Sequence, residues 1–145
     1  MQRRTLFPSA AAAVVGLFGL SRASAEPSTR QKAVYHVDDL DKVSEALANI
    51  RNHVEGTGGP GGADLRLVVN GPALRAFQRS SADARLSART DELVRAHVGF
   101  EACANTMKGL KLTLADLLPG FAVAEKGGVV RITELQMQGY AYIKP

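Results

Sequence analysis

The chain has 145 residues, with 18 Lys or Arg, 14 Asp or Glu and a single Cys. This length suits one domain with one core, and one cysteine excludes an intramolecular disulfide. The formal charge of +4 owes much to Arg3, Arg4 and Arg22, which lie in a segment that we expect to be removed. The remaining 15 basic and 14 acidic residues nearly balance, so no basic surface for a nucleic acid is expected.

Residues 1–25 have the order of a secretory signal peptide. Arg3 and Arg4 precede an apolar run from Ala10 to Leu20, and Ala23-Ser24-Ala25 supplies a cleavage site. The apolar run is shorter than the ~20 residues of a membrane-spanning helix, so we expect no stable membrane span after cleavage. The arginine pair fits a twin-arginine signal as well as a Sec signal, and the route stays open. We therefore expect a periplasmic protein with a polar tether over residues 26–31 and one domain over residues 32–145.

Short β-rich runs alternate with helical patterns along the mature chain. Asp38 and Asp39 are suited to cap the first helix. The alternation predicts a single α/β domain with a roughly five-stranded, mainly parallel sheet and helices on both faces. The predicted strands are Lys32–Val37, Asp64–Val69, Gly99–Cys103, Phe121–Ala124 and Tyr140–Ile143. The predicted helices are Leu40–Val54, Ala73–Phe77, Ala84–His97, a turn over Ala104–Lys108, Leu114–Leu118 and Val129–Gln138.

A glycine-rich segment over residues 56–61 has the letters of a dinucleotide-binding pattern. It follows a helix and precedes a strand, which is the reverse of the order that phosphate binding needs, and Pro60 removes an amide. We interpret this segment as a loop. The three histidines, His36, His53 and His97, show no metal-ligand spacing with one another or with Cys103. No metal or other cofactor is expected, and only His36, near the end of the first strand, is placed to face a site.

Cys103 is the candidate for chemistry because of its position. It ends a predicted strand and precedes a helical turn, and ligands collect at that edge of a parallel sheet. The amides of Ala104, Asn105 and Thr106 are expected to point toward the sulfur and favour its thiolate. The alternative is a buried cysteine that acts as a small apolar side chain.

Four segments resemble the DsrE/DsrF-like family, and in particular its small exported members. The similarity runs from about Lys32 to the end of the chain. The segments are Val68–Leu74, Phe100–Met107, Asp116–Gly120 and Gln138–Pro145.

The resemblance implies a five-stranded parallel α/β domain that forms homo-oligomers, either trimers or hexamers. It also implies that Cys103 matches the cysteine that accepts sulfane sulfur as a persulfide in sulfur-transferring members. Those members are cytoplasmic, whereas this chain carries an export signal, so its donor and acceptor proteins do not follow from the family.

The leading hypothesis is an exported sulfur carrier, similar to a sulfurtransferase, that holds a persulfide on Cys103 and passes the sulfur to a partner thiol. Asn70, Gly71, Asn105 and Thr106 are expected to line the site, with His36 as a further candidate. Two alternatives stay open. One is a non-catalytic oligomeric binding module in which Cys103 is structural, and the other is a redox sensor that forms an intersubunit disulfide.

Overall fold

The computed structural model describes residues 30–145. The predicted signal peptide and all but the last two residues of the predicted tether lie outside the described residues. Five strands form one sheet in the order β4-β3-β2-β1-β5, and every neighbouring pair is parallel. This confirms the predicted fold class. The strands are β1 (Gln31–Val37), β2 (Ala63–Val69), β3 (Gly99–Cys103), β4 (Phe121–Ala124) and β5 (Ala141–Ile143).

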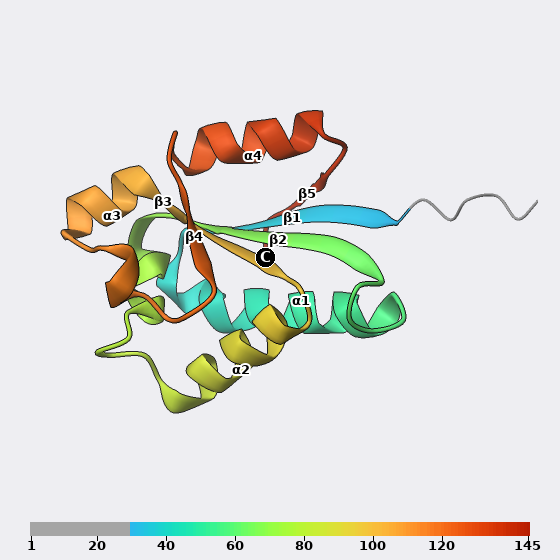
Figure 1. Cartoon of the computed structure of the whole chain (residues 1–145), viewed down its shortest axis with the longest axis horizontal. Helices are drawn as coiled ribbons and strands as arrows, with labels where there is room; N and C mark the ends of the chain where they lie inside the picture. Colours follow the sequence, from blue (N-terminus) through green and yellow to red (C-terminus); the bar gives the residue numbers. More distant parts are fainter. Residues whose placement is uncertain (1–29) are drawn as a thin grey trace, which may run out of the picture.

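The helices lie on both faces of the sheet, as Figure 1 shows. Helix α4 covers one face, α1 and α2 cover the other, and α3 lies at the end of the sheet where the strands finish. None of these helices, within residues 30–145, is long and apolar enough to cross a membrane. The helices are α1 (Val43–Gly56), α2 (Ala84–Arg95), α3 (Ala104–Leu110) and α4 (Gly128–Met137), with 3₁₀ turns η1 (Leu40–Lys42), η2 (Gly71–Phe77) and η3 (Leu114–Asp116).

Several predicted boundaries differ from the structure by one or two residues. The helix predicted to reach His97 ends at Arg95, because His97 has a left-handed backbone with φ of 67° that a helix does not allow. The short helix expected from Ala73 begins at Gly71 and is a 3₁₀ helix. Asp39 caps η1 by accepting a hydrogen bond from the Asp41 amide, as predicted for this acidic pair.

Two apolar cores lie on the two faces of the sheet. The larger core joins the sheet to α1 and α2 and includes Phe77, Phe100 and Phe121, whose rings meet edge to face at 5.1–6.3 Å. The smaller core lies beneath α4 and consists of Val34, Val68, Ile132, Leu135 and Tyr140.

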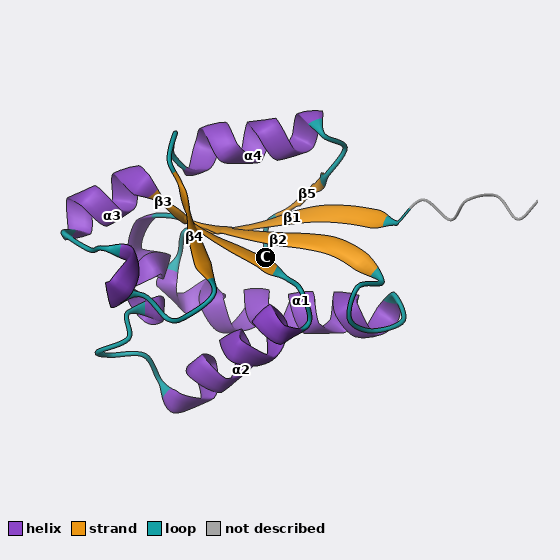
Figure 2. Ribbon diagram, in the orientation of Figure 1, coloured by secondary structure: helices purple, strands orange, loops and turns teal. Residues whose placement is uncertain are grey.

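Side-chain alternation along β3 separates its residues between these two faces. Phe100 and Ala102 belong to the larger core, so Glu101 and Cys103 face α4. Because all strands are parallel, their carboxyl ends meet at one edge of the sheet, beside α3 and the first turn of α4 (Figure 2). Val69 of β2 pairs with Ala102, and the turn after β2 therefore lies next to Cys103.

Candidate functional site

Cys103 is the last residue of β3 and the N-cap residue of α3, and it is 5% exposed. The prediction that it ends a strand and precedes a helix is correct. Strand β3 is an interior strand, but the middle strand of the sheet is β2.

Hydrogen-bond donors around the sulfur lower the pKa of this thiol. Burial by itself raises the pKa of Cys103, but hydrogen bonds from the Thr106 amide, the Gly128 amide, the Thr106 hydroxyl and the Asn105 amide lower it below its ordinary value. A cysteine buried among apolar groups alone would have a raised pKa. The arrangement therefore favours a thiolate, the form of cysteine that acts as a nucleophile.

Two of the three predicted amide donors are present. The amides of Asn105 and Thr106 are among the largest contributions that lower the pKa of Cys103. The additional donor is Gly128, which begins α4 and lies far from Cys103 in the sequence. The sequence carries one signal for it, the pair Gly127-Gly128 at the start of the helix that follows β4.

Thr106 connects the ends of two strands. Its Oγ1 accepts a hydrogen bond of 2.9 Å from the Gly71 amide, and the same hydroxyl lowers the pKa of Cys103. Gly71 has φ of +57°, and a Cβ there would lie 3.2 Å from the Asp38 carbonyl oxygen. Glycine is therefore needed for this turn, and its amide holds Thr106 in place.

The first turn of α4 packs directly against the site. A Cβ on Gly128 would lie 3.4 Å from Cβ of Cys103 and 3.5 Å from Cβ of Asn70. The absence of a side chain lets this turn approach the thiol closely. Asn105 packs against Gly127, the residue before Gly128. Its Nδ2 lies 2.7 Å from the position that a Cβ on Gly127 would occupy. The structure thus brings the predicted residues Asn70, Gly71, Asn105 and Thr106 around Cys103.

A buried ion pair, which the sequence did not predict, fastens α4 to β3. Glu101 has a side chain that is 8% exposed, and Arg131 donates to its two oxygens at 2.5 and 3.0 Å. These residues line an open pocket of about 390 Å³ together with Lys126 and Glu134. Glu134 in turn pairs with both Lys126 and Arg131. Because these charges satisfy one another, we interpret the cluster as an anchor for α4.

His36, on β1, lies two strands from Cys103 and bonds to Asn70, which follows the strand between them. Its Nε2 is 2.8 Å from Oδ1 of Asn70, and its Nδ1 is 2.8 Å from the hydroxyl of Tyr142. Tyr142, on β5, was not predicted as a site residue. His53 packs on the opposite face with Tyr35, and His97 is exposed.

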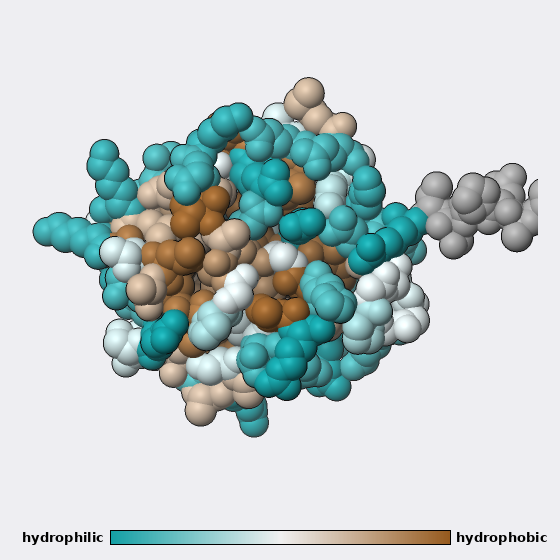
Figure 3. Space-filling model, in the orientation of Figure 1, coloured by the Kyte–Doolittle hydropathy of each residue, from teal (hydrophilic) through white to brown (hydrophobic). Residues whose placement is uncertain are grey.

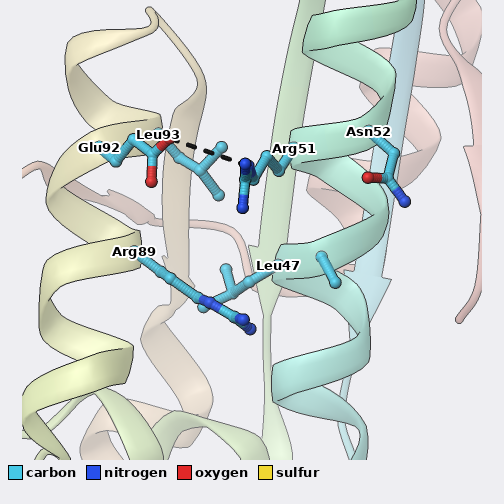
Figure 4. A pocket seen from close by; sticks show the side chains of 7 residues that line it. Leu47, Arg51, Asn52, Arg89, Glu92 and Leu93 are labelled. Carbon is cyan, nitrogen blue, oxygen red and sulfur yellow. Dashed lines mark ion pairs between the residues drawn. The ribbon is translucent and has the colours of Figure 1, made fainter.

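A second small pocket lies between α1 and α2, on the face of the sheet away from Cys103. Figure 4 shows Arg51 and Glu92 facing each other across it, with an N–O distance of 3.9 Å, while Arg89 extends toward Leu47. Its volume of about 60 Å³ is far below the ~300 Å³ at which ligand pockets begin. We assign it no ligand.

The fold and the site together define a class of protein. Among residues 30–145, no three His, Cys, Asp or Glu side chains are grouped as metal ligands would be. The domain is a parallel α/β sheet with one cysteine, whose pKa is lowered, at its carboxyl edge. The DsrE/DsrF-like family model matches residues 33–145, and the chain belongs to this family.

Solved structures with the same fold include proteins from an archaeon and from bacteria. MTH1491 of Methanobacterium thermoautotrophicum, described as a protein of unknown function, is 29% identical with a TM-score of 0.69, over 79% of this chain and 99% of its own. The ychN protein of E. coli is 16% identical with a TM-score of 0.65 over 79% and 99%. BT1422 of Bacteroides thetaiotaomicron is 14% identical with a TM-score of 0.60 over 79% and 95%. No curated protein sequence matches the chain.

Replacing Thr106 tests the hydrogen bonds around the sulfur. Thr106→Val keeps the shape but removes the hydroxyl, and a hydrogen bond to a charged group contributes about 1.5–3 kcal/mol. We expect the pKa of Cys103 to rise and alkylation at neutral pH to slow, as measured by the pH dependence of thiolate absorbance and of iodoacetamide labelling. Thr106→Ser is the matched control and should stay close to the parent protein. An unchanged pKa in Thr106→Val would show that the hydroxyl does not act on the sulfur.

Proposed function

We propose that the protein is a sulfur carrier, similar to a sulfurtransferase, that holds sulfane sulfur as a persulfide on Cys103 and relays it to a partner thiol. Membership of the DsrE/DsrF-like family supports a role in sulfur relay. The observation that carries the proposal is that hydrogen bonds to the Cys103 sulfur outweigh its burial and favour the thiolate.

The chemistry has two steps. In the first, the Cys103 thiolate attacks the outer sulfur of a donor such as thiosulfate. A new S–S bond forms, the bond to the sulfonyl sulfur breaks, and sulfite leaves with the electron pair. In the second, a partner thiol attacks the outer sulfur of the persulfide and the Cys103 thiolate is released. The donors that favour the thiolate, Thr106 and Gly128 among them, stabilise it again as the leaving group.

The second candidate function is a binding module in which Cys103 is structural. Its support is the low exposure of the residue, 5%, which restricts access by large reagents. The same burial speaks against the redox-sensor hypothesis, because an intersubunit disulfide needs two sulfurs within about 2 Å of each other.

We also propose that the protein acts in the periplasm after removal of residues 1–25, by the Sec or the twin-arginine route. The support is the sequence of the amino-terminal segment. The mass of the protein recovered from a periplasmic extract tests this, since a chain that begins at Glu26 is expected. A full-length chain in the cytosol would contradict it.

A homo-oligomer, trimer or hexamer, is the proposed assembly, with β4 at the contact between copies. Strand β4 is an edge strand with β3 as its neighbour, and its residues include neither proline nor a charged residue that would protect the edge. Figure 3 shows apolar side chains gathered over β4 and the segment before it. Leu114 in that segment is exposed, as is Ala122 on the strand.

Sulfur loading of Cys103 is the first prediction from this proposal. We expect the mature protein, purified without reductant and treated with thiosulfate or polysulfide, to gain the mass of one sulfur atom that a reductant removes. Cys103→Ser should fold normally and gain nothing. If Cys103→Ser gains the same mass, or if the parent protein gains none and resists alkylation, the carrier proposal is wrong and the binding module replaces it.

The assembly prediction concerns the mass in solution. Light scattering after size-exclusion chromatography should give three or six times the mass of one chain. Leu114→Lys combined with Ala122→Lys should reduce this mass, because charges at the contact oppose association. Met137→Lys, on the highly exposed end of α4, is the control and should leave the mass unchanged. A parent protein that is monomeric would contradict the proposal.

A further inference from the structure

We propose that the side-chain amide of Asn70 holds the sulfane sulfur of the Cys103 persulfide. Its Nδ2 donates a hydrogen bond to the outer sulfur, and His36 fixes the orientation of the amide. This inference rests on the proposed function and locates the space that receives the sulfur. It follows from the hydrogen bonds of Asn70 and from the close approach of Gly128.

Asn70 lies beside Cys103 on the same face of the sheet. Val69 and Ala102 are paired across β2 and β3. The next residues along, Asn70 and Cys103, therefore meet where these two strands end. A Cβ on Gly128 would lie 3.5 Å from Cβ of Asn70 and 3.4 Å from Cβ of Cys103. Both side chains thus extend toward the first turn of α4 and flank the same point.

One hydrogen bond sets the orientation of the Asn70 amide. Its Oδ1 is 2.8 Å from Nε2 of His36, and because a carbonyl oxygen only accepts, Nε2 carries the proton and donates. His36 is on β1, and the strand order puts β1 and β3 on opposite sides of β2, which Asn70 follows. In a planar carboxamide the oxygen and the nitrogen point to opposite sides of the Cβ–Cγ bond. With Oδ1 toward β1, Nδ2 is turned toward β3 and Cys103.

The Nδ2 group of Asn70 keeps its two hydrogens for a ligand. Within residues 30–145 it bonds to no other group, and no side-chain nitrogen that lacks a partner is shut off from solvent. An amide nitrogen can donate both of its hydrogens. On the other side of Cys103 lies Ala124 of β4, which is buried and has no polar side-chain atom. Of the two residues that flank Cys103 on neighbouring strands, Asn70 is therefore the one that can donate to a sulfur.

Gly128 leaves room between Asn70 and Cys103. The side of Gly128 on which a Cβ would stand faces Cβ of both residues and Cγ1 of Val68, at 3.4–3.5 Å. Because glycine carries only a hydrogen there, a second sulfur attached to Sγ can extend into this space. An S–S bond is about 2.05 Å long and adjacent strands lie about 4.8 Å apart, so the outer sulfur comes within hydrogen-bond reach of Nδ2.

The hydrogen bond acts on the charge of the loaded form. The Cys103 thiolate attacks the outer sulfur of thiosulfate, an S–S bond to Sγ forms, and sulfite leaves with the electron pair of the broken bond. Thiolate and thiosulfate dianion become persulfide anion and sulfite dianion, so atoms and charge balance without an oxidant or a reductant. The persulfide carries its negative charge on the outer sulfur. Since hydrogen bonds to charged groups are the stronger ones, Nδ2 stabilises the loaded form relative to the empty one.

The equilibrium between thiosulfate and sulfite measures how firmly the sulfur is held. Asn70→Ala, Gly128→Ala and Asn52→Ala proteins are incubated with thiosulfate and sulfite in a series of ratios, and intact mass gives the loaded fraction. The ratio of thiosulfate to sulfite at half loading should be roughly 10–100-fold higher in Asn70→Ala than in the parent, the size expected for one hydrogen bond to a charged group. Gly128→Ala keeps the amide but adds a methyl group in the space, and should also need a higher ratio. Asn52→Ala is the control, on an exposed position of α1 across the sheet (Figure 4), and should match the parent.

The reactivity of the empty thiol separates this role from a structural one. The groups that mainly lower the pKa of Cys103 belong to α3 and to the start of α4. Iodoacetamide labelling of Asn70→Ala should therefore keep the pH dependence of the parent. His36 is tested as a positioning residue by two variants. His36→Gln can still donate to Oδ1 and should load like the parent, whereas His36→Leu cannot donate and should need a higher ratio of thiosulfate to sulfite.

Each other outcome contradicts a stated part of the inference. Half loading of Asn70→Ala at the ratio of the parent overturns it, and so does a change in its thiol pKa that accounts for the whole loss. Parent-like loading of Gly128→Ala shows that the sulfur does not lie beside Gly128, and parent-like loading of His36→Leu removes the role of His36. If the parent gains no sulfur at any ratio, the carrier proposal and this inference both fail. A parent that loads independently of Asn70 removes this inference alone.

Discussion

The hydroxyl of Thr106 is the contact on which the site depends, because a single oxygen serves the ends of two strands. A hydroxyl has one proton to donate. Oγ1 accepts from the Gly71 amide, so its own proton is available to the Cys103 sulfur, whose pKa this hydroxyl lowers. The acidity of the thiol is therefore set partly by the turn after β2. The turn after β2 itself requires the positive φ of Gly71.

The other side of the thiol depends on how α4 is held. Its first turn supplies the Gly128 amide, and the ion pair between Glu101 and Arg131 fastens the next part of the helix to the same strand that carries Cys103. A buried ion pair gains little net stability, because both groups lose hydration. The ion pair matters more for the position of α4 than for the stability of the fold. Both oxygens of Glu101 bond the Arg131 guanidinium, which joins α4 to the strand that carries Cys103.

Much of this arrangement follows from local sequence, and the rest does not. The alternation of apolar runs predicts five strands, and the position of Cys103 between a strand and a helical turn predicts its place at the carboxyl edge. Asn105 and Thr106 follow because they are adjacent to it. Gly128, Glu101 with Arg131, and Tyr142 act through contacts between distant segments, which depend on strand order and on how α4 lies over the sheet.

The two histidine clusters show why placement carries more information than composition. Tyr35, His53 and Gln31 repeat the groups found in Tyr142, His36 and Asn70, with similar distances. From residue types alone the two sets are equivalent. They differ because parallel strands bring Asn70, Cys103 and the first turn of α4 to one edge, while Gln31 begins β1 and so belongs to the other edge. Adjacent residues of one strand, Tyr35 and His36, thus point to opposite faces, and His36 bonds to Asn70 on the face that α4 covers.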